Sequence, residues 1–322
     1  MRGSALLMVL WLTAALSAIA FAVASNVRGE TERTSTDVEG LRAYYLATGA
    51  VERAISWVDW GPGHRNPDGT PVFFNPPMPF IHYQFPAGVA DVELIPESAK
   101  LNINSAPPDQ LARLLAALAV TPDRAGMIVQ GILDWRAPTP GGAFTDFDQY
   151  YLSLTPSFRS RHASFEEIEE LLLVRGVTPE LFYGGYDKGP DGNLLPRPGL
   201  KDCLSVYGGS AVYDINTVAA PVMVAAGLAP QTAALIVAMR QQKPFLKQEE
   251  INAVPEIGAA GGHIGLGASQ YLTIRATAAA RLPNGRLSDV KRSVAALIMY
   301  FGQQYTPSFH ILRWYDNAVR LQ

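Results

Sequence analysis

Apolar residues fill the N-terminal part of the chain, and no charged residue occurs between Ser4 and Val27. About 24 helical residues, each rising about 1.5 Å, reach about 36 Å, which is enough to cross the hydrocarbon core of a bilayer. Arg2 precedes this run, whereas the charges that follow it cancel one another: Arg28, Glu30, Glu32 and Arg33. The positive-inside rule therefore predicts a single-pass helix with a cytoplasmic N-terminus and the rest of the chain across the membrane.

Helical periodicity continues beyond the apolar run. Large or β-branched residues recur three or four positions apart, and charged residues lie between them. The stripe consists of Val38, Leu41, Tyr45, Thr48, Val51 and Ile55, followed by Val58. This spacing predicts one long helix over residues 4–58, whose second half packs through one face.

The pattern changes to short extended segments after Asp59. Residues 59–86 are rich in Gly, Pro and Asn, which predicts loop and sheet edge, and Val89–Ile95 alternates like a strand. Further strands are expected near the end of the chain, at 271–278, 291–301 and 310–315, with a hairpin turn at Pro283-Asn284-Gly285. Strands at both ends enclose a long helical pattern, which predicts an α+β fold: a small antiparallel sheet with a large inserted all-α domain.

The enclosed segment contains a weak internal repeat. Leu101-Asn102-Ile103-Asn104-Ser105 matches Tyr213-Asp214-Ile215-Asn216-Thr217, and both lead into helix starts that contain proline. Ser105 and Thr217 are the N-caps expected for these helices. Helices are predicted at 108–119, 122–136, 165–174, 221–226 and 230–241.

A helix-hairpin-helix DNA-binding module is an alternative interpretation of this repeat, because such modules present backbone amides to phosphates. Its hairpins need glycines, but the turns here are Ala119-Val120-Thr121-Pro122 and Gly227-Leu228-Ala229-Pro230, in which proline supplies no amide. The 26 Lys and Arg are scattered and the net charge is -3. The sequence thus argues against a nucleic-acid partner.

Catalytic motifs are missing from the sequence. It contains no Gly-x-Ser-x-Gly, no Gly-rich phosphate loop and no His-Glu-x-x-His, and its five histidines lie far apart. The single cysteine, Cys203, cannot form an intrachain disulfide. The expectation is a protein that is not an enzyme.

Several stretches together resemble one protein family. Met1-Arg2-Gly3-Ser4-Ala5-Leu6-Leu7 is similar to a prepilin leader, and it is followed in order by Ala99–Asn104, Gly142–Gly176 and Asp214–Thr217. In this order the stretches resemble the K-type minor pseudopilin of type II secretion systems. The resemblance implies cleavage by prepilin peptidase after Gly3 and N-methylation of Ser4. It also fits Met8, which stands where most pilins carry Glu at the fifth mature position.

The resemblance implies a domain organisation: leader 1–3, transmembrane and spine helix 4–58, first part of a pilin-like β domain 59–98, inserted α-domain with two helix-pair subrepeats 99–268, and closing strands 269–322. It implies a bacterial inner-membrane protein with a periplasmic body at the tip of the pseudopilus, helping to initiate assembly and export. The implied partners are the I-type and J-type minor pseudopilins, prepilin peptidase and the inner-membrane assembly platform. The stripe from Val38 to Ile55 is then expected to pack on partner helices.

Calcium is the cofactor that the resemblance suggests. Residues 142–151 are expected to form a loop, and in it Asp146 and Asp148 lie where this family carries acidic residues associated with bound calcium, although the family's Gly-Ala-Glu-Asp is here Gly142-Ala143-Phe144-Thr145. Acidic residues usual after Trp135 are also replaced, by Arg136-Ala137-Pro138, so at least one calcium site is expected to be weakened or lost. Asp187 and Asp191 form a weaker candidate loop with alternating oxygen donors.

A secretory signal peptide is the alternative interpretation of the N-terminus, because Ala22-Val23-Ala24 fits a signal-peptidase site that would release a periplasmic or secreted binding protein. The apolar run is longer than a usual signal core, which favours the retained helix. Mass spectrometry of the mature N-terminus separates the two. We expect N-methylated Ser4, and a free Ser25 would contradict the anchored form.

Overall fold

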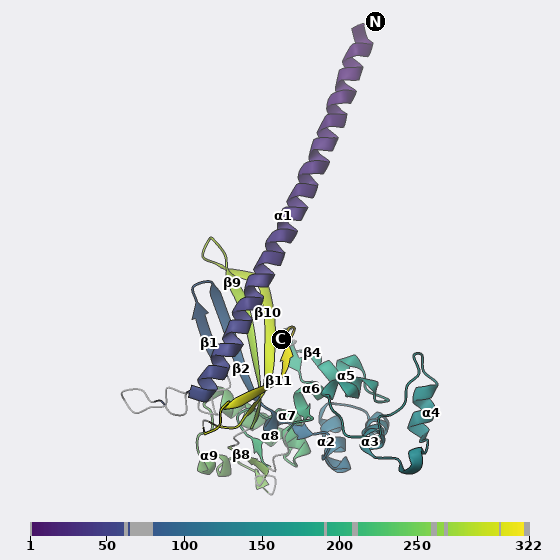
Figure 1. The fold of residues 1–322 in the computed structure, drawn as a ribbon, viewed down its shortest axis with the longest axis vertical. Coiled ribbons are helices and arrows are strands. Elements are labelled where there is room, and N and C mark those ends of the chain that lie inside the picture. Colours follow the sequence, from purple (N-terminus) through teal and green to yellow (C-terminus); the bar gives the residue numbers. More distant parts are fainter. Residues whose placement is uncertain are drawn as a thin grey trace.

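The computed structural model describes residues 2–60, 64, 80–189, 192–207, 212–258, 263–266, 270–302 and 304–318, and the side chains of the helix from residue 8 onward. It confirms the predicted fold class, because a long N-terminal helix packs on an antiparallel sheet and a helical domain is inserted between the second and third strands of that sheet (Figure 1).

Helix α1 (Arg2–Trp60) is continuous. The first proline of the chain is Pro62, so no proline removes a helical hydrogen bond before Trp60. Its N-terminal part projects away from the body (Figure 1). Within the described chain, Met8–Trp60 is the one helix long and apolar enough to span a membrane, and its apolar window is not buried at all.

The sheet consists of β1 (Phe80–Phe85), β2 (Gly88–Pro96), β9 (Tyr271–Arg281), β10 (Leu287–Tyr300) and β11 (Phe309–Tyr315), in the order β1-β2-β9-β10-β11. All neighbouring strands are antiparallel. Three of the four predicted strands are therefore confirmed with small shifts of their ends and β10 begins earlier than expected, while β1 lies in a stretch predicted as loop and sheet edge. The predicted hairpin is present, with Gly285 at φ 82° and the Asn284 side chain accepting the Arg286 amide.

The second half of α1 covers one face of the sheet. The helix contributes small and branched residues to the shared core: Ala47, Ala50, Val51, Ala54, Ile55 and Val58. Alternate residues of the central strands meet them, among them Val92, Ala276 and Ala296. Because alanine side chains are short, the helix axis can approach the sheet closely, and the strand pleat supplies the complementary apolar surface.

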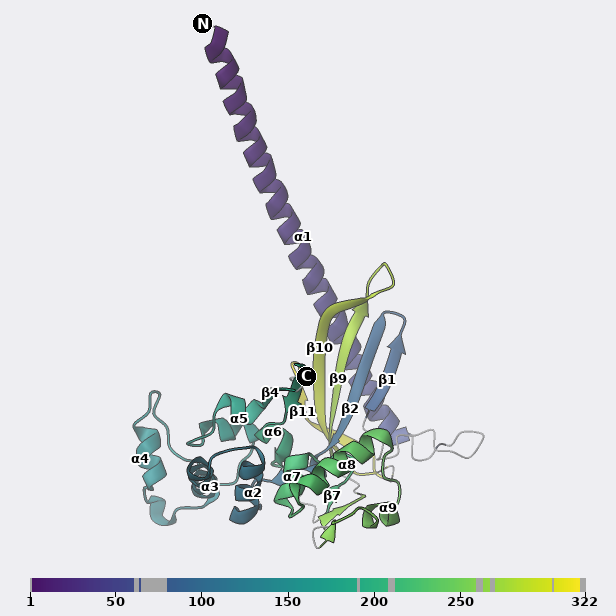
Figure 2. The same ribbon diagram turned by 180° about the vertical axis from the view of Figure 1, so that it is seen from behind.

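The inserted domain lies at the end of the sheet opposite the free part of α1 (Figures 1 and 2). Its helices are α2 (Pro108–Ala117), α3 (Pro122–Arg136), α4 (Asp146–Leu152), α5 (Pro179–Tyr183), α6 (Leu200–Cys203), α7 (Ala220–Ala225), α8 (Pro230–Gln242) and α9 (Gln248–Asn252), with the 3-10 turns η2 (Glu97–Ala99), η3 (Pro140–Gly142) and η4 (Ile168–Leu173). Short strands accompany them: β3 (Leu101–Asn102), β4 (Gly185–Lys188), β5 (Leu194–Arg197), β6 (Leu204–Ser205), β7 (Tyr213–Asp214) and β8 (Ile264–Gly265).

The internal repeat is real in three dimensions. In each copy a two-residue strand pairs in parallel with a later one, β3 with β6 and β7 with β8. Asn104 then pairs through its side-chain amide with both backbone groups of Phe165, and Asn216 does the same with Phe245. The same side chain, at the same step of the chain, therefore fixes the same loop in both copies.

An arginine and a glutamate complete each copy. Arg136 donates to the carbonyls of Ile103 and Ala106, and Arg240 donates to those of Ile215 and Val218. Five residues after the paired phenylalanine, Glu170 or Glu250 accepts backbone amides of the preceding turn. The domain is thus a duplicated unit, and the two copies meet where Arg113 of α2 donates to the carbonyl of Ala225 in α7.

Three local predictions are wrong. The segment 165–174 forms the 3-10 turn η4 instead of an α-helix, because Asn104 and Glu170 hold its first amides. The expected loop over 142–151 contains α4, which Thr145 begins with a capping box. Ser105 and Thr217 are not N-caps, since α2 and α7 start three residues later, after Pro107 and Ala219.

Polar contacts join the helical domain to the sheet. The buried Glu97 accepts from Lys100 at 3.1 Å and from the Thr273 hydroxyl of β9 at 2.6 Å. Arg313 of β11 pairs with Glu167. Since both contacts lie between sequence-distant segments, they set how the domain stands on the sheet.

The asparagine clamps predict a measurable loss of stability. In Asn216→Ala, the buried amide and carbonyl of Phe245 lose their partners, and we expect the free energy of unfolding to fall by about 2 to 4 kcal/mol. Tryptophan fluorescence during urea unfolding of the full chain in detergent would measure this change. Asn284→Ala, in an exposed turn, is the matched control, with an expected loss below about 1 kcal/mol. Equal losses in both variants would contradict the clamp.

Candidate functional site

The outward face of α1 is the first candidate site. Val38, Leu41 and Tyr45 follow one another at helical spacing, and they are 42%, 56% and 65% exposed. On the opposite side of the same turns, Ala43 and Ala47 are completely buried. In these turns the helix therefore presents bulky apolar side chains to its surroundings and small side chains to its own sheet.

The predicted stripe of six residues is divided between these two faces. Val51 and Ile55 are buried in the core under the sheet, Thr48 is half-buried, and Val38, Leu41 and Tyr45 point outward. The cause is the spacing of the stripe. Its residues lie fewer than about 3.6 positions apart on average, which is less than one helical turn, so the stripe rotates around the helix axis by roughly 160° between Val38 and Val58. Partner packing stays a prediction, and only the first part of the stripe is free to make it.

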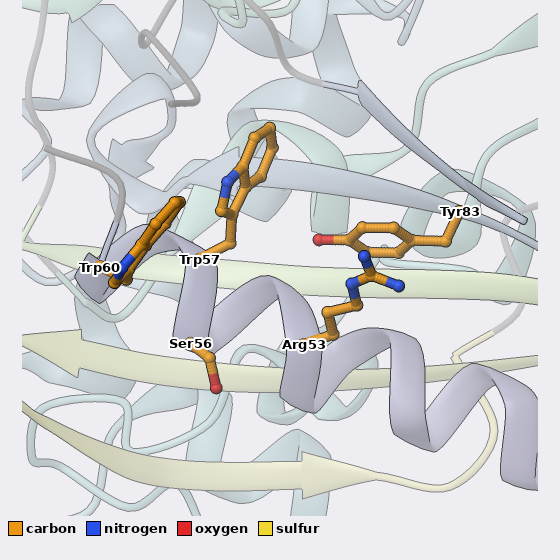
Figure 3. Close-up of a pocket in the computed structure, with 5 residues that line it drawn as sticks. All are labelled: Arg53, Ser56, Trp57, Trp60 and Tyr83. Atoms are coloured by element: carbon orange, nitrogen blue, oxygen red, sulfur yellow. The ribbon is translucent and has the colours of Figure 1, made fainter. Parts of the chain in front are cut away.

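A small cavity lies at the C-terminal end of α1 (Figure 3). It measures about 340 Å³ and is lined by Arg53, Ser56, Trp57, Trp60 and Tyr83. The Arg53 guanidinium lies 4.6 Å from the centre of the Tyr83 ring, and the Tyr83 hydroxyl points toward Trp57. That hydroxyl is buried and makes no hydrogen bond.

The cavity has the chemistry of a binding surface. Burial raises the pKa of Tyr83, and the charge of Arg53 opposes this only in part, so the phenol stays neutral at physiological pH. Ser56 donates its hydroxyl to the carbonyl of Glu52, and the described lining holds no base that could activate it. Aromatic walls and an arginine can hold a ligand by stacking and hydrogen bonding, but this set assembles no catalytic pair.

The inserted domain carries the second candidate site, on a segment that breaks its internal symmetry. In the second copy, Arg240 and Phe245 are separated by residues 241–244 alone. In the first copy, the equivalent Arg136 and Phe165 are separated by residues 137–164, which contain η3 and α4. The predicted calcium residues Asp146 and Asp148 both lie in this extra segment.

Asp148 is completely buried and fully engaged by nitrogen donors. It accepts hydrogen bonds from the backbone amides of Thr145 and Ser160, from Nε of Arg159 and from Nε2 of His162. Burial acts to raise the pKa of this carboxyl group, but the hydrogen bonds of His162, Thr145 and Arg159 and the charge of His162 outweigh it, so the pKa is lowered. The contacts therefore contribute to stability at neutral pH, and their contribution is lost as the pH falls through this lowered pKa.

The structure does not bring the two predicted calcium residues together. Asp146 is exposed in the first turn of α4, whereas Asp148 points into the domain. Among the described residues there is no group of three His, Cys, Asp or Glu side chains that could hold a metal ion. Calcium at these residues stays a prediction, and the donors around Asp148 do not fit it as folded.

The remaining predicted residues have simpler surroundings. Asp187 lies in β4 and pairs with Arg197 of β5 at 3.3 Å, and Asp191 lies outside the described residues. Gly3 and Ser4 belong to the backbone of α1, and their processing stays a prediction.

Sequence reasoning missed Arg159 and His162, which complete the Asp148 cluster. The run Arg159-Ser160-Arg161-His162 is the most basic stretch near the acidic loop. The opposite charges of the two stretches were the signal that could have indicated their contact. It also missed the paired Arg136 and Arg240, although both close the second helix of their repeat copy.

Comparisons with known proteins agree with this architecture. Residues 92–183 match the family model described as type II secretion system protein K. A chain from the crystal structure of the GspK-GspI-GspJ complex of the enterotoxigenic Escherichia coli type 2 secretion system is 17% identical, and the similarity covers 90% of this chain and 98% of that one with a TM-score of 0.51. No curated protein is significantly similar in sequence.

The solved chain shares the fold, and the matched family domain runs from within β2 to the end of α5, so it includes most of the first repeat copy and its extra segment. Residues 92–183 thus form a domain similar to protein K of type II secretion systems, and the chain as a whole has the fold of the solved chain.

Proposed function

We propose that this chain is a K-type minor pseudopilin and that it stands at the tip of the pseudopilus, where it helps to initiate assembly and supports protein export. In this proposal α1 crosses the bacterial inner membrane, with the N-terminus in the cytoplasm and the body in the periplasm. Prepilin peptidase processes the chain between Gly3 and Ser4, and the inner-membrane assembly platform receives it. The protein acts by shape and packing, without catalysis.

The observation that carries the proposal is the double use of α1. One face of its second half is buried against the sheet of the same chain, while Val38, Leu41 and Tyr45 stay exposed on the other face. Burying a leucine contributes about 1.5 to 3 kcal/mol, so such a stripe gains free energy by packing on other helices. The I-type and J-type minor pseudopilins are the proposed partners, and GspI and GspJ accompany GspK in the similar solved complex.

Two further features support a position at the tip. Met8 is exposed on the membrane part of α1, where it offers no carboxylate to the N-terminal amine of a neighbouring subunit. The helical domain, at the opposite end of the sheet, extends far to one side of α1 (Figure 1). A subunit that lacks the carboxylate and carries a broad domain at its far end fits the end of a helical stack better than its interior.

A substitution on the free face of α1 tests partner packing. Leu41→Asp places a carboxylate in the proposed helix-helix contact, and we expect the amount of I-type and J-type subunits that co-purify to fall by about tenfold or more, since 1.4 kcal/mol is a factor of ten. The measurement is affinity purification of the full chain from detergent-solubilised membranes that contain the complete secretion system. The melting temperature is expected to stay unchanged, because Leu41 makes little contact with its own sheet.

Lys291→Asp is the control, since Lys291 is exposed on β10 and alternates along that strand with the residues that face α1, so it lies away from the free face of the helix. This variant should retain its partners. Undiminished co-purification of Leu41→Asp, or equal loss in both variants, would remove the basis of the proposed packing.

A further inference from the structure

The extra segment of the first repeat copy contains an arginine with an unusual set of partners. Nη2 of Arg159 donates to the carbonyl oxygens of Gly142 and Ala143, at 3.0 and 2.8 Å. Nε of the same side chain donates to the carboxylate of Asp148 at 3.2 Å. Two backbone carbonyls and a buried carboxylate thus converge on one guanidinium group. The same group lies over the ring of Phe144, with its Cζ atom 4.3 Å from the ring centre.

These oxygens are of the kind that calcium binds in proteins. Calcium takes carboxylates and backbone carbonyls from flexible loops, and Gly141 and Gly142 give this loop positive φ angles of 65° and 71°. In this chain the oxygens already surround a positive charge, and guanidinium cannot be deprotonated in proteins. A divalent ion at this point would have to displace Arg159 from all three of its acceptors.

His162 adds a second side chain to the cluster. Its Nδ1 lies 3.1 Å from the carbonyl oxygen of Asp134, and its Nε2 lies 2.9 Å from the carboxylate of Asp148. The His162 side chain is 9% exposed, so these two contacts are largely shielded from water.

We infer that Arg159 and His162 occupy the place of a divalent cation in this protein, and that they hold the extra segment without calcium. Arg159 ties the loop at Gly142 and Ala143 to the first turn of α4, and His162 ties α4 to the end of α3. The two side chains contact the same carboxylate, that of Asp148. The segment is consequently ordered by residues of its own chain.

Hydrogen exchange of the full-length protein in detergent tests this inference, with calcium chloride or the chelator EGTA as the two conditions. We expect the amides of residues 139–149 in the wild type to exchange at the same rate in both. Exchange that becomes about tenfold faster in EGTA, and slows again when calcium is restored, would overturn the inference.

Two variants test the side chains themselves. Arg159→Met removes the guanidinium group and keeps the length of the side chain, whereas Asp148→Asn keeps the shape of the carboxylate without its charge. We expect about tenfold faster exchange or more over residues 139–149 in both variants, with or without calcium. Unchanged exchange in Arg159→Met would contradict the inference.

Arg124→Met is the matched control, because Arg124 also bridges loop and helix in this domain, through the carbonyl of Gly176 and the hydroxyl of Thr178. Its effect should be confined to that loop. Amides of α8, in the other repeat copy, report whether a variant is folded. If Arg159→Met unfolds the whole domain, the comparison of calcium with EGTA in the wild type decides the question.

Discussion

The close contact between α1 and the sheet is the constraint on which the rest of the structure depends. The helix meets the sheet through Ala43, Ala47, Ala50 and Ala54, all completely buried. Small residues let the backbones approach, while Val38, Leu41 and Tyr45 lie exposed on the opposite face. One helix therefore anchors the sheet and leaves an apolar stripe exposed on its other face, while the strands that it covers carry the helical domain at their far end.

Much of the fold follows from local patterns, because strand alternation and a long apolar run depend only on which residues face the core. The strands around Val92, Ala276 and Ile311, the hairpin at Asn284 and the long helix could all be predicted in this way. The candidate sites were harder. The stripe from Val38 to Ile55 crosses two faces because its spacing differs from the helical repeat, and only the position of the sheet shows which part is free.

The Asp148 cluster could not be predicted from local patterns, because its members come from segments that meet only after folding. His162 has φ 51°, an uncommon conformation for a residue with a side chain, and the contacts to Asp134 and Asp148 hold it there. The duplicated scaffold explains where such a site can arise. Arg136 and Phe165, which Asn104 holds, have counterparts in Arg240 and Phe245, so the segment between Arg136 and Phe165 can vary without loss of the core.

Photocrosslinking in cells with a complete secretion system would test whether the free face of α1 is an intersubunit contact. A photoreactive phenylalanine analogue at position 41 or 45 should form adducts with the I-type or J-type subunits, because these side chains point away from the sheet. The same probe at position 291, on the sheet and away from this face, should form few. Adducts of equal yield at all three positions, or none at 41 and 45, would contradict a helix that uses one face for its own sheet and the other for its partners.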